Sequence, residues 1–149
     1  MPTHREKYFL PYTVEQIYDL VVDIDRYPEF LPWCLEAHVR EKSRKKIIAD
    51  LAVGYSIFKE RFTSRVLLSP PNRIDVVYEE GPFEHLDNHW IFTPINKKHG
   101  NKTLLCEIDF YVDFAFKSPT FEKLMQGFFV QAVHHMVQAF EERAKTLYG

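Results

Sequence analysis

The sequence predicts an α+β fold in which a curved antiparallel sheet of about six to seven strands wraps around one long C-terminal helix. Two short helices are expected after the first strand. Apolar residues recur with a period of about two from Leu35 to Phe116, as in strands with one dry face. From Ser118 to about Leu147 they recur at helical spacing instead. An antiparallel sheet with one apolar face needs a cover, and this last helix is long enough to provide it.

The first elements are predicted from their boundary residues. Residues 3–10 read as a strand. Thr13 and Gln16 have the spacing of a capping box, which predicts the start of a short helix. Pro28 suits the first position of a second helix of about one turn, and Pro32 ends it. The apolar face of the first helix consists of Ile17, Leu20, Val21 and Ile24.

Turn residues divide the period-two region into strands. Turns are expected near Gly54–Ser56, at SPPN (69–72), at EGPF (80–83) and at the polar hairpin NKKHGN (96–101). The strand after this hairpin has the clearest alternation of the chain. Its apolar side consists of Leu104, Cys106, Ile108, Phe110, Val112, Phe114 and Phe116.

The C-terminal helix is predicted to begin at Ser118 and Pro119, an N-cap residue and a first-turn proline. About 28 residues give a rod roughly 40 Å long, enough to cross a sheet. No change of composition marks a boundary, so residues 1–149 are expected to form a single domain.

Composition limits the classes of function. Apolar residues make up 46% and charged residues 27% of the chain, and the net charge of −2 argues against a DNA partner. Cys34 and Cys106 form no metal-binding motif and are expected to be buried free thiols. The N-terminal sequence MPTHREKYF lacks the apolar run of a signal peptide, and no apolar stretch is long enough to span a membrane. We therefore expect a cytoplasmic protein.

The aromatic share of 15% is high, and many of these residues fall on the dry face of the sheet and on the long helix. They could fill a core or line a ligand cavity. Bulky planar residues on two facing walls tend to leave slots, and ligand pockets are mainly apolar with a few polar groups. The predicted lining residues are Phe58, Phe62, Tyr78, Trp90, Phe110, Phe114, Leu124, Met125, Phe128 and Phe129.

Three polar residues share the inward side of their strands with these aromatic residues. They are Glu60, Glu80 and Asn88. Burying such groups without hydrogen bonds is costly, so they either contact the polar head group of a ligand or are carried into solvent by strand ends and bulges.

The segment RYPEFLPWC (26–34) holds three aromatic residues and two prolines, and with prolines so close a long helix or an interior strand cannot form. It is either core filler or the mouth of a cavity. Tyr27, Phe30, Leu31 and Trp33 are the candidates for a mouth that contacts the membrane. On this hypothesis, replacing Phe30 and Leu31 by serine weakens membrane association and leaves the melting temperature nearly unchanged.

Evidence for catalysis or metal binding is lacking in the sequence. His85 and His89 share a strand face without further ligands, and His134 and His135 diverge on the helix. Cys34 has no motif that would activate it. We therefore expect no enzyme and no metal site.

Three segments carry a family resemblance that spans about Tyr8 to Gly149. YTVEQIYDLVVDIDRYPEFLPWC, GPFEHLDNHWIFTP and MVQAFEERAKTLYG resemble the coenzyme Q-binding, START-like proteins. These belong with the polyketide cyclase/dehydrase-like proteins and share their sequence pattern with the bacterial ribosome-association toxins. The resemblance implies a helix-grip fold and non-enzymatic binding of ubiquinone, or a similar isoprenoid quinone, between sheet and helix. Such a carrier supports respiratory electron transport and makes transient peripheral contact with the inner face of the membrane.

The toxin branch implies an alternative, in which the protein binds the large ribosomal subunit and blocks subunit association. A modest basic cluster at a hairpin is either a contact for this partner or a solvated turn. It consists of Arg40, Lys42, Arg44, Lys45 and Lys46.

Overall fold

The computed structural model describes residues 3–55 and 58–149, with the side chains of residues 55, 58 and 124–130 excepted. In chain order the elements are β1 (Thr3–Leu10), α1 (Val14–Val22), the 3₁₀ helix η1 (Ile24–Glu29), β2 (Cys34–Lys42), β3 (Lys46–Tyr55), β4 (Phe58–Ser69), β5 (Arg73–Glu80), β6 (Phe83–His99), β7 (Lys102–Phe116) and α2 (Pro119–Tyr148).

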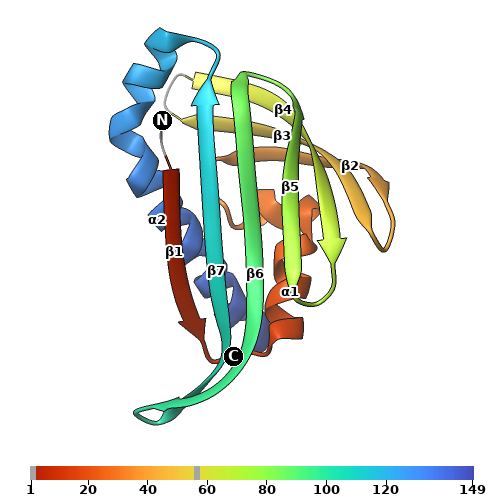
Figure 1. Cartoon of the computed structure of the whole chain (residues 1–149), viewed down its shortest axis with the longest axis vertical. Coiled ribbons are helices and arrows are strands. Elements are labelled where there is room, and N and C mark those ends of the chain that lie inside the picture. Colours follow the sequence, from red (N-terminus) through yellow and green to blue (C-terminus); the bar gives the residue numbers. More distant parts are fainter. Residues whose placement is uncertain (1–2, 56–57) are drawn as a thin grey trace.

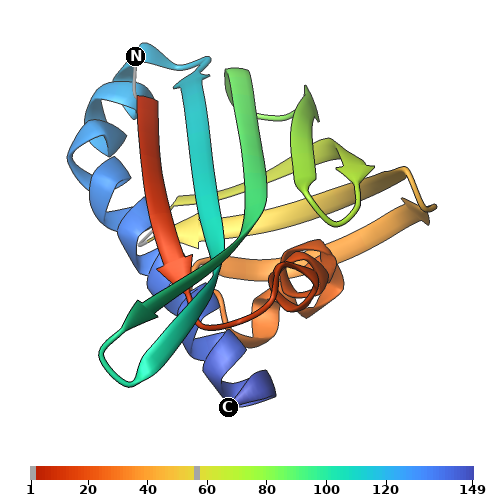
Figure 2. The same ribbon diagram turned by 60° about the horizontal axis from the view of Figure 1, so that its bottom comes forward.

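The strands form one seven-stranded antiparallel sheet in the order β1-β7-β6-β5-β4-β3-β2 (Figure 1). The sheet is strongly curved, and α2 runs along its inner side (Figure 2). The predicted α+β architecture is therefore confirmed. Apolar alternation along each strand gives the sheet one dry face, and α2 covers that face.

Between β1 and β2, the predicted start of the first helix is confirmed, but the predicted start of the second is not. Thr13 Oγ1 accepts a hydrogen bond from the Gln16 amide at 3.1 Å, and the Gln16 side chain accepts one from the Thr13 amide at 2.9 Å. The capping box is thus confirmed. Pro28, however, lies near the end of η1, so its expected place at a first helical position is wrong. The 3₁₀ turn begins directly after α1, and the fixed φ of proline fits its later positions equally well.

The β5–β6 and β6–β7 connections show which residues determine where the strands end. Gly81 separates β5 from β6 with φ of +146°, and a Cβ there would come within 2.6 Å of the Phe62 Cβ, which explains the predicted break at EGPF. The strands β6 and β7 continue through the predicted polar hairpin, so that only Gly100 and Asn101 lie between them. This arm projects beyond the sheet (Figures 1 and 2). In this arm, formed by the end of β6 and the start of β7, neither strand has an apolar face. The polar residues were therefore expected to form a turn, although most of them belong to the two strands. The turn expected near Gly54–Ser56 lies partly outside the described residues.

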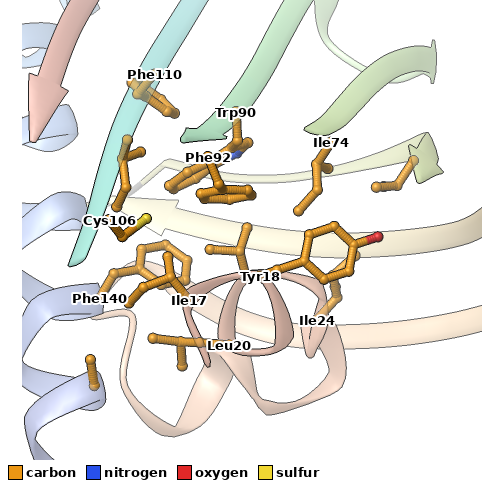
Figure 3. Packing of buried hydrophobic residues seen from close by; sticks show 14 of the residues in the cluster. Ile17, Tyr18, Leu20, Ile24, Ile74, Trp90, Phe92, Cys106, Phe110 and Phe140 are labelled. Atoms are coloured by element: carbon orange, nitrogen blue, oxygen red, sulfur yellow. The ribbon is translucent and has the colours of Figure 1, made fainter. Parts of the chain in front are cut away.

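Several of the most deeply buried side chains lie where α1 packs against β6 and β7 (Figure 3). Ile17 of α1 is only 2% exposed, and Phe92 of β6 and Cys106 of β7 opposite it are 1% and 0% exposed. The Tyr18 ring meets the Phe92 ring edge-on at 6.1 Å. This solid end of the core leaves the region between the sheet and α2 as the place for a cavity.

Candidate functional site: an apolar cavity between the sheet and α2

A cavity of about 300 Å³ lies between the inner face of the sheet and α2. Strands β2 to β7 all contribute wall residues, and the segment from α1 to β2 closes one side. The helix contributes Ala132, Val133, Met136 and Phe140. The volume is at the lower end of the range found for small-molecule sites, and such sites are typically apolar with few polar groups. This cavity has that character.

Aromatic side chains gather at two places along the wall. Around Trp90, the rings of Phe110 and Phe140 lie 4.8 and 5.3 Å away, both in edge-to-face geometry. These three residues and the neighbouring core are seen in Figure 3. The second group surrounds Phe83, whose ring meets those of Phe62 and Phe114 edge-on at 5.5 and 5.6 Å. The wall therefore offers planar apolar surfaces on which a ring or an unsaturated chain can pack.

The structure brings together several of the predicted cavity residues. Phe62, Trp90, Phe110 and Phe114 lie on the wall. Tyr78 does not, because its ring packs against Phe83, which lines the wall itself, and its hydroxyl accepts a hydrogen bond from the Phe83 amide at 3.1 Å. The other predicted lining residues fall outside the described side chains: Phe58, Leu124, Met125, Phe128 and Phe129.

The polar candidates separate into two groups. Glu60 and Glu80 are exposed, so the interpretation that they contact a head group inside the cavity is wrong. Glu60 lies close to the start of β4, and Glu80 is the last residue of β5, opposite a bulge. Asn88 does lie on the wall, and its side-chain amide donates a hydrogen bond to the Tyr111 carbonyl at 2.8 Å.

Ser64 is a polar wall residue that sequence reasoning missed. It is 3% exposed, and its hydroxyl has no hydrogen-bond partner among the described residues. The available signal was its position, because Ser64 alternates with Phe62 and Val66 on the inward side of β4. Since buried hydroxyls normally find a partner, an unpaired one on a cavity wall requires an explanation.

Of the predicted mouth residues, Tyr27, Leu31 and Trp33 lie on the cavity wall. Leu31 is only 6% exposed, so the expectation that it forms an exposed lip is wrong. Its amide donates to the Tyr27 carbonyl at 2.9 Å, which continues the η1 turn and holds Leu31 in the core. The Tyr27 hydroxyl donates to the Val21 carbonyl, and burial raises the pKa of Tyr27.

Phe30 is half-buried and lies outside the cavity. Its ring packs edge-on against Phe140 at 5.2 Å, and the Arg143 guanidinium lies 5.1 Å from its centre. Phe30 also lines a shallow outer groove of about 520 Å³ along α2. Phe30 therefore packs against the helix, and only part of its ring is available to a membrane.

The two cysteines are buried, and burial raises the pKa of the Cys34 thiol to about 11 and that of Cys106 to about 12. At pH 8 a thiol with a pKa of 11 is ionised in about one molecule per thousand. We expect iodoacetamide at pH 8 to leave both cysteines unmodified in the folded protein and to modify both after denaturation. Mass spectrometry of the intact chain measures this. Modification of Cys34 in the folded protein would show that the cavity wall opens to solvent.

No group of three or more histidine, cysteine, aspartate or glutamate side chains in the described part of the chain is arranged to hold a metal ion. None of the helices, within the described residues, is long and apolar enough to cross a membrane.

Comparison with known proteins identifies the family. Residues 10–141 match the family described as "Polyketide cyclase / dehydrase and lipid transport". The chain belongs to this family. A curated relative is the "Ribosome association toxin RatA" of Pseudomonas aeruginosa, which is 38% identical over 150 residues that cover all of both chains. A second is the "Coenzyme Q-binding protein COQ10 homolog B, mitochondrial" of Xenopus laevis, 34% identical over 147 residues. That match covers 98% of this chain and 59% of the frog protein.

A solved relative agrees with the fold. The 18 kDa protein CC1736 from Caulobacter crescentus is 33% identical, covers 100% of this chain and 99% of its own, and superposes with a TM-score of 0.75. The family resemblance predicted from the three sequence segments is therefore confirmed, together with the helix-grip, START-like fold. Because the family description covers cyclases and dehydrases as well as lipid transport, the site must decide between catalysis and carriage.

Proposed function

We propose that the protein binds ubiquinone, or a similar polyprenyl lipid, in the cavity between the sheet and α2 and carries it without altering it chemically. The cavity itself is the observation that carries the proposal: it holds about 300 Å³, and its wall is almost entirely aliphatic and aromatic. The relationship to a coenzyme Q-binding protein supports the choice of a quinone.

The size of the cavity supports a particular division of the ligand. A volume near 300 Å³ accommodates a substituted ring and the first part of a tail, but not a long polyprenyl chain. In the proposed complex the ring lies between the sheet and α2, and the remaining tail leaves the cavity. A carrier of this kind acts as a single domain in the cytoplasm and visits the inner face of the membrane to exchange its lipid.

The chemistry of the wall supports carriage over catalysis. The raised pKa of Cys34 keeps this thiol protonated at neutral pH and therefore a poor nucleophile. The Ser64 hydroxyl has no base within hydrogen-bond reach among the described residues. An enzyme of the acyl-transfer or cyclase type needs an activated nucleophile or a tuned acid–base pair, and these groups do not supply one.

Lipid identification tests the proposal. The protein is purified without detergent from cells that make ubiquinone, and native mass spectrometry is followed by extraction and identification of the released lipid. We expect one bound quinone or polyprenyl lipid per chain. A protein that neither retains such a lipid nor takes one up from quinone-loaded vesicles would contradict the proposal.

A second candidate function is supported by the full-length similarity to the ribosome association toxin of Pseudomonas aeruginosa. In this alternative the chain binds the large ribosomal subunit and prevents subunit association. The basic hairpin between β2 and β3 is the candidate contact. Arg40 and Lys46 there are paired with Asp50 and Glu41, while Lys42, Arg44 and Lys45 have no ion-pair partner among the described residues. Sucrose-gradient profiles after overexpression test it: loss of 70S particles supports the alternative, and unchanged profiles remove it.

A further inference from the structure

Ser64 carries a hydroxyl, unpaired among the described residues, on the wall of the apolar cavity. Resting on the proposed function, we propose that Ser64 is the polar anchor of the site and that its hydroxyl donates a hydrogen bond to a carbonyl oxygen of the bound lipid. The ligand class is thereby narrowed to lipids whose head group carries a carbonyl, such as a quinone ring. A hydrocarbon of the same shape fits the cavity but leaves this hydroxyl unpaired.

Burying a hydroxyl without a partner costs about 1–3 kcal/mol. Ser64 is 3% exposed and makes no hydrogen bond to any other described residue, so the described part of the protein does not offset this cost. An alanine on the same strand position would avoid it, as Ala49, its neighbour on β3, does. A partner supplied by the ligand explains why a hydroxyl is placed here.

Ser64 belongs to the inward row of β4, with Phe62 and Val66 on either side, and all three line the cavity. Its side chain can therefore turn toward the ligand by rotation about one bond. The wall around it is apolar, so a hydrogen bond formed there is shielded from water.

Asn88 is a second wall residue with a hydrogen-bonding side chain, whereas the Tyr27 hydroxyl, also on the wall, already donates to the Val21 carbonyl. Val66 pairs with Val76, and Val76 pairs with Asn88, so Ser64 and Asn88 lie two strands and two residues apart. On a flat sheet this places their Cα atoms roughly 12 Å apart, and the inward curvature brings the side chains closer. The Tyr111 carbonyl holds one N–H of Asn88, which leaves the rest of its amide for the ligand. Ser64 and Asn88 thus lie on two sides of a space in the middle of the wall. A quinone ring in this space points one carbonyl oxygen toward each of them.

The orientation of the ligand follows from this placement. The head group lies at mid-sheet, between the aromatic groups around Trp90 and Phe83, and the tail runs along one of these apolar surfaces. A lipid bound with its head outward would bring hydrocarbon against Ser64 and gain nothing from it.

Titration with two ligands tests the proposal. The probes are a benzoquinone with a ten-carbon alkyl tail and the benzene with the same tail, which lacks oxygen. Trp33 and Trp90 both line the cavity, so quenching of tryptophan fluorescence measures quinone binding. The affinity for the hydrocarbon is measured by its displacement of bound quinone. We expect Ser64→Ala to weaken quinone binding about tenfold and to leave hydrocarbon affinity within about twofold, as the loss of one buried hydrogen bond predicts. Ser64→Thr, which keeps the hydroxyl, should retain most of the quinone affinity.

Two controls separate recognition from structure. Ser69→Ala removes an exposed serine hydroxyl from the same strand and should change neither affinity. Thermal melts of unliganded Ser64→Ala should show no loss of stability, because the variant removes an unpaired group. The carbonyl stretch of carbon-13-labelled quinone should lie at lower frequency in the parent protein than in Ser64→Ala.

The outcomes distinguish this inference from the proposed function. If the quinone binds equally well to the parent and Ser64→Ala, with no carbonyl shift, the anchor is refuted while lipid binding stands. Ser64 then serves a buried water or the fold alone. If neither probe binds the parent protein, in solution or from vesicles, the proposed function fails and the anchor fails with it.

Discussion

The Val76→Phe variant is expected to lose quinone binding by at least about 100-fold while remaining folded. Val76 is half-buried on β5 and lines the middle of the cavity. A phenylalanine there extends into the space that the ring occupies. A steric conflict worth about 3 kcal/mol lowers the affinity roughly 100-fold, and in the empty protein the cavity itself accepts the larger side chain. Tryptophan quenching measures the affinity, and circular dichroism measures the fold.

The adjacent residue provides the matched control for this variant. Val77 is also half-buried, but it lies on the opposite face of β5, where it pairs with Arg65 and Asp87. Val77→Phe makes the same chemical change outside the cavity and should bind quinone as the parent does. Equal binding by both variants, or equal loss in both, would show that the ligand is not in this cavity.

The Leu31→Ala variant is expected to lower the free energy of unfolding by about 3 kcal/mol, equivalent to roughly 10 °C in melting temperature. Leu31 is 6% exposed and belongs to the core cluster, so the truncation removes buried apolar contacts and enlarges the cavity. This is the reverse of the sequence-based expectation, which treated Leu31 as an exposed lip. Urea unfolding followed by tryptophan fluorescence measures the change.

Leu35, four residues further along the chain in β2, gives the comparison. Leu35 is 46% exposed, and Leu35→Ala should change stability by no more than about 0.5 kcal/mol. If Leu31→Ala is as mild as Leu35→Ala, the segment is a surface feature and Leu31 regains its candidacy for membrane contact.

Most of the fold could be predicted from the sequence because most of the element boundaries have a local cause. The Thr13–Gln16 capping box, the Ser118 N-cap and the turn at Gly81 depend on neighbouring residues, and the long apolar alternation of β7 can form only one face. The extent of the arm formed by β6 and β7 could not be predicted in this way. The two strands pair with each other beyond the core, where no side chain has to be apolar. The alternation of apolar residues therefore does not show where these strands end.

The cavity wall was predictable in outline, and the errors have physical causes. Strand parity placed Phe62, Trp90 and Asn88 on the wall but could not show that Glu60 and Glu80 leave the cavity at strand ends. The alternation along β4 also places Ser64 on the inward side, but no sequence motif marks a single serine as a binding residue. That its hydroxyl lacks a partner is a fact of three-dimensional packing.

Leu31 illustrates a different limit. A short segment between prolines has no period from which an inward face could be read. The direction of Leu31 depends on the hydrogen bond from its amide to the Tyr27 carbonyl. Such a local backbone contact is visible only in the folded chain.

The central claim is that the ligand lies between the sheet and α2, and nuclear magnetic resonance can locate it directly. The protein is labelled with carbon-13 in its methyl groups and bound to unlabelled short-tailed quinone, and intermolecular Overhauser effects are recorded. Our account predicts contacts from the quinone ring to the methyl groups of Val76, Val112 and Met136, which line the cavity on β5, β7 and α2. Contacts confined to exposed leucines such as Leu67 and Leu147, with none to these three, would contradict it.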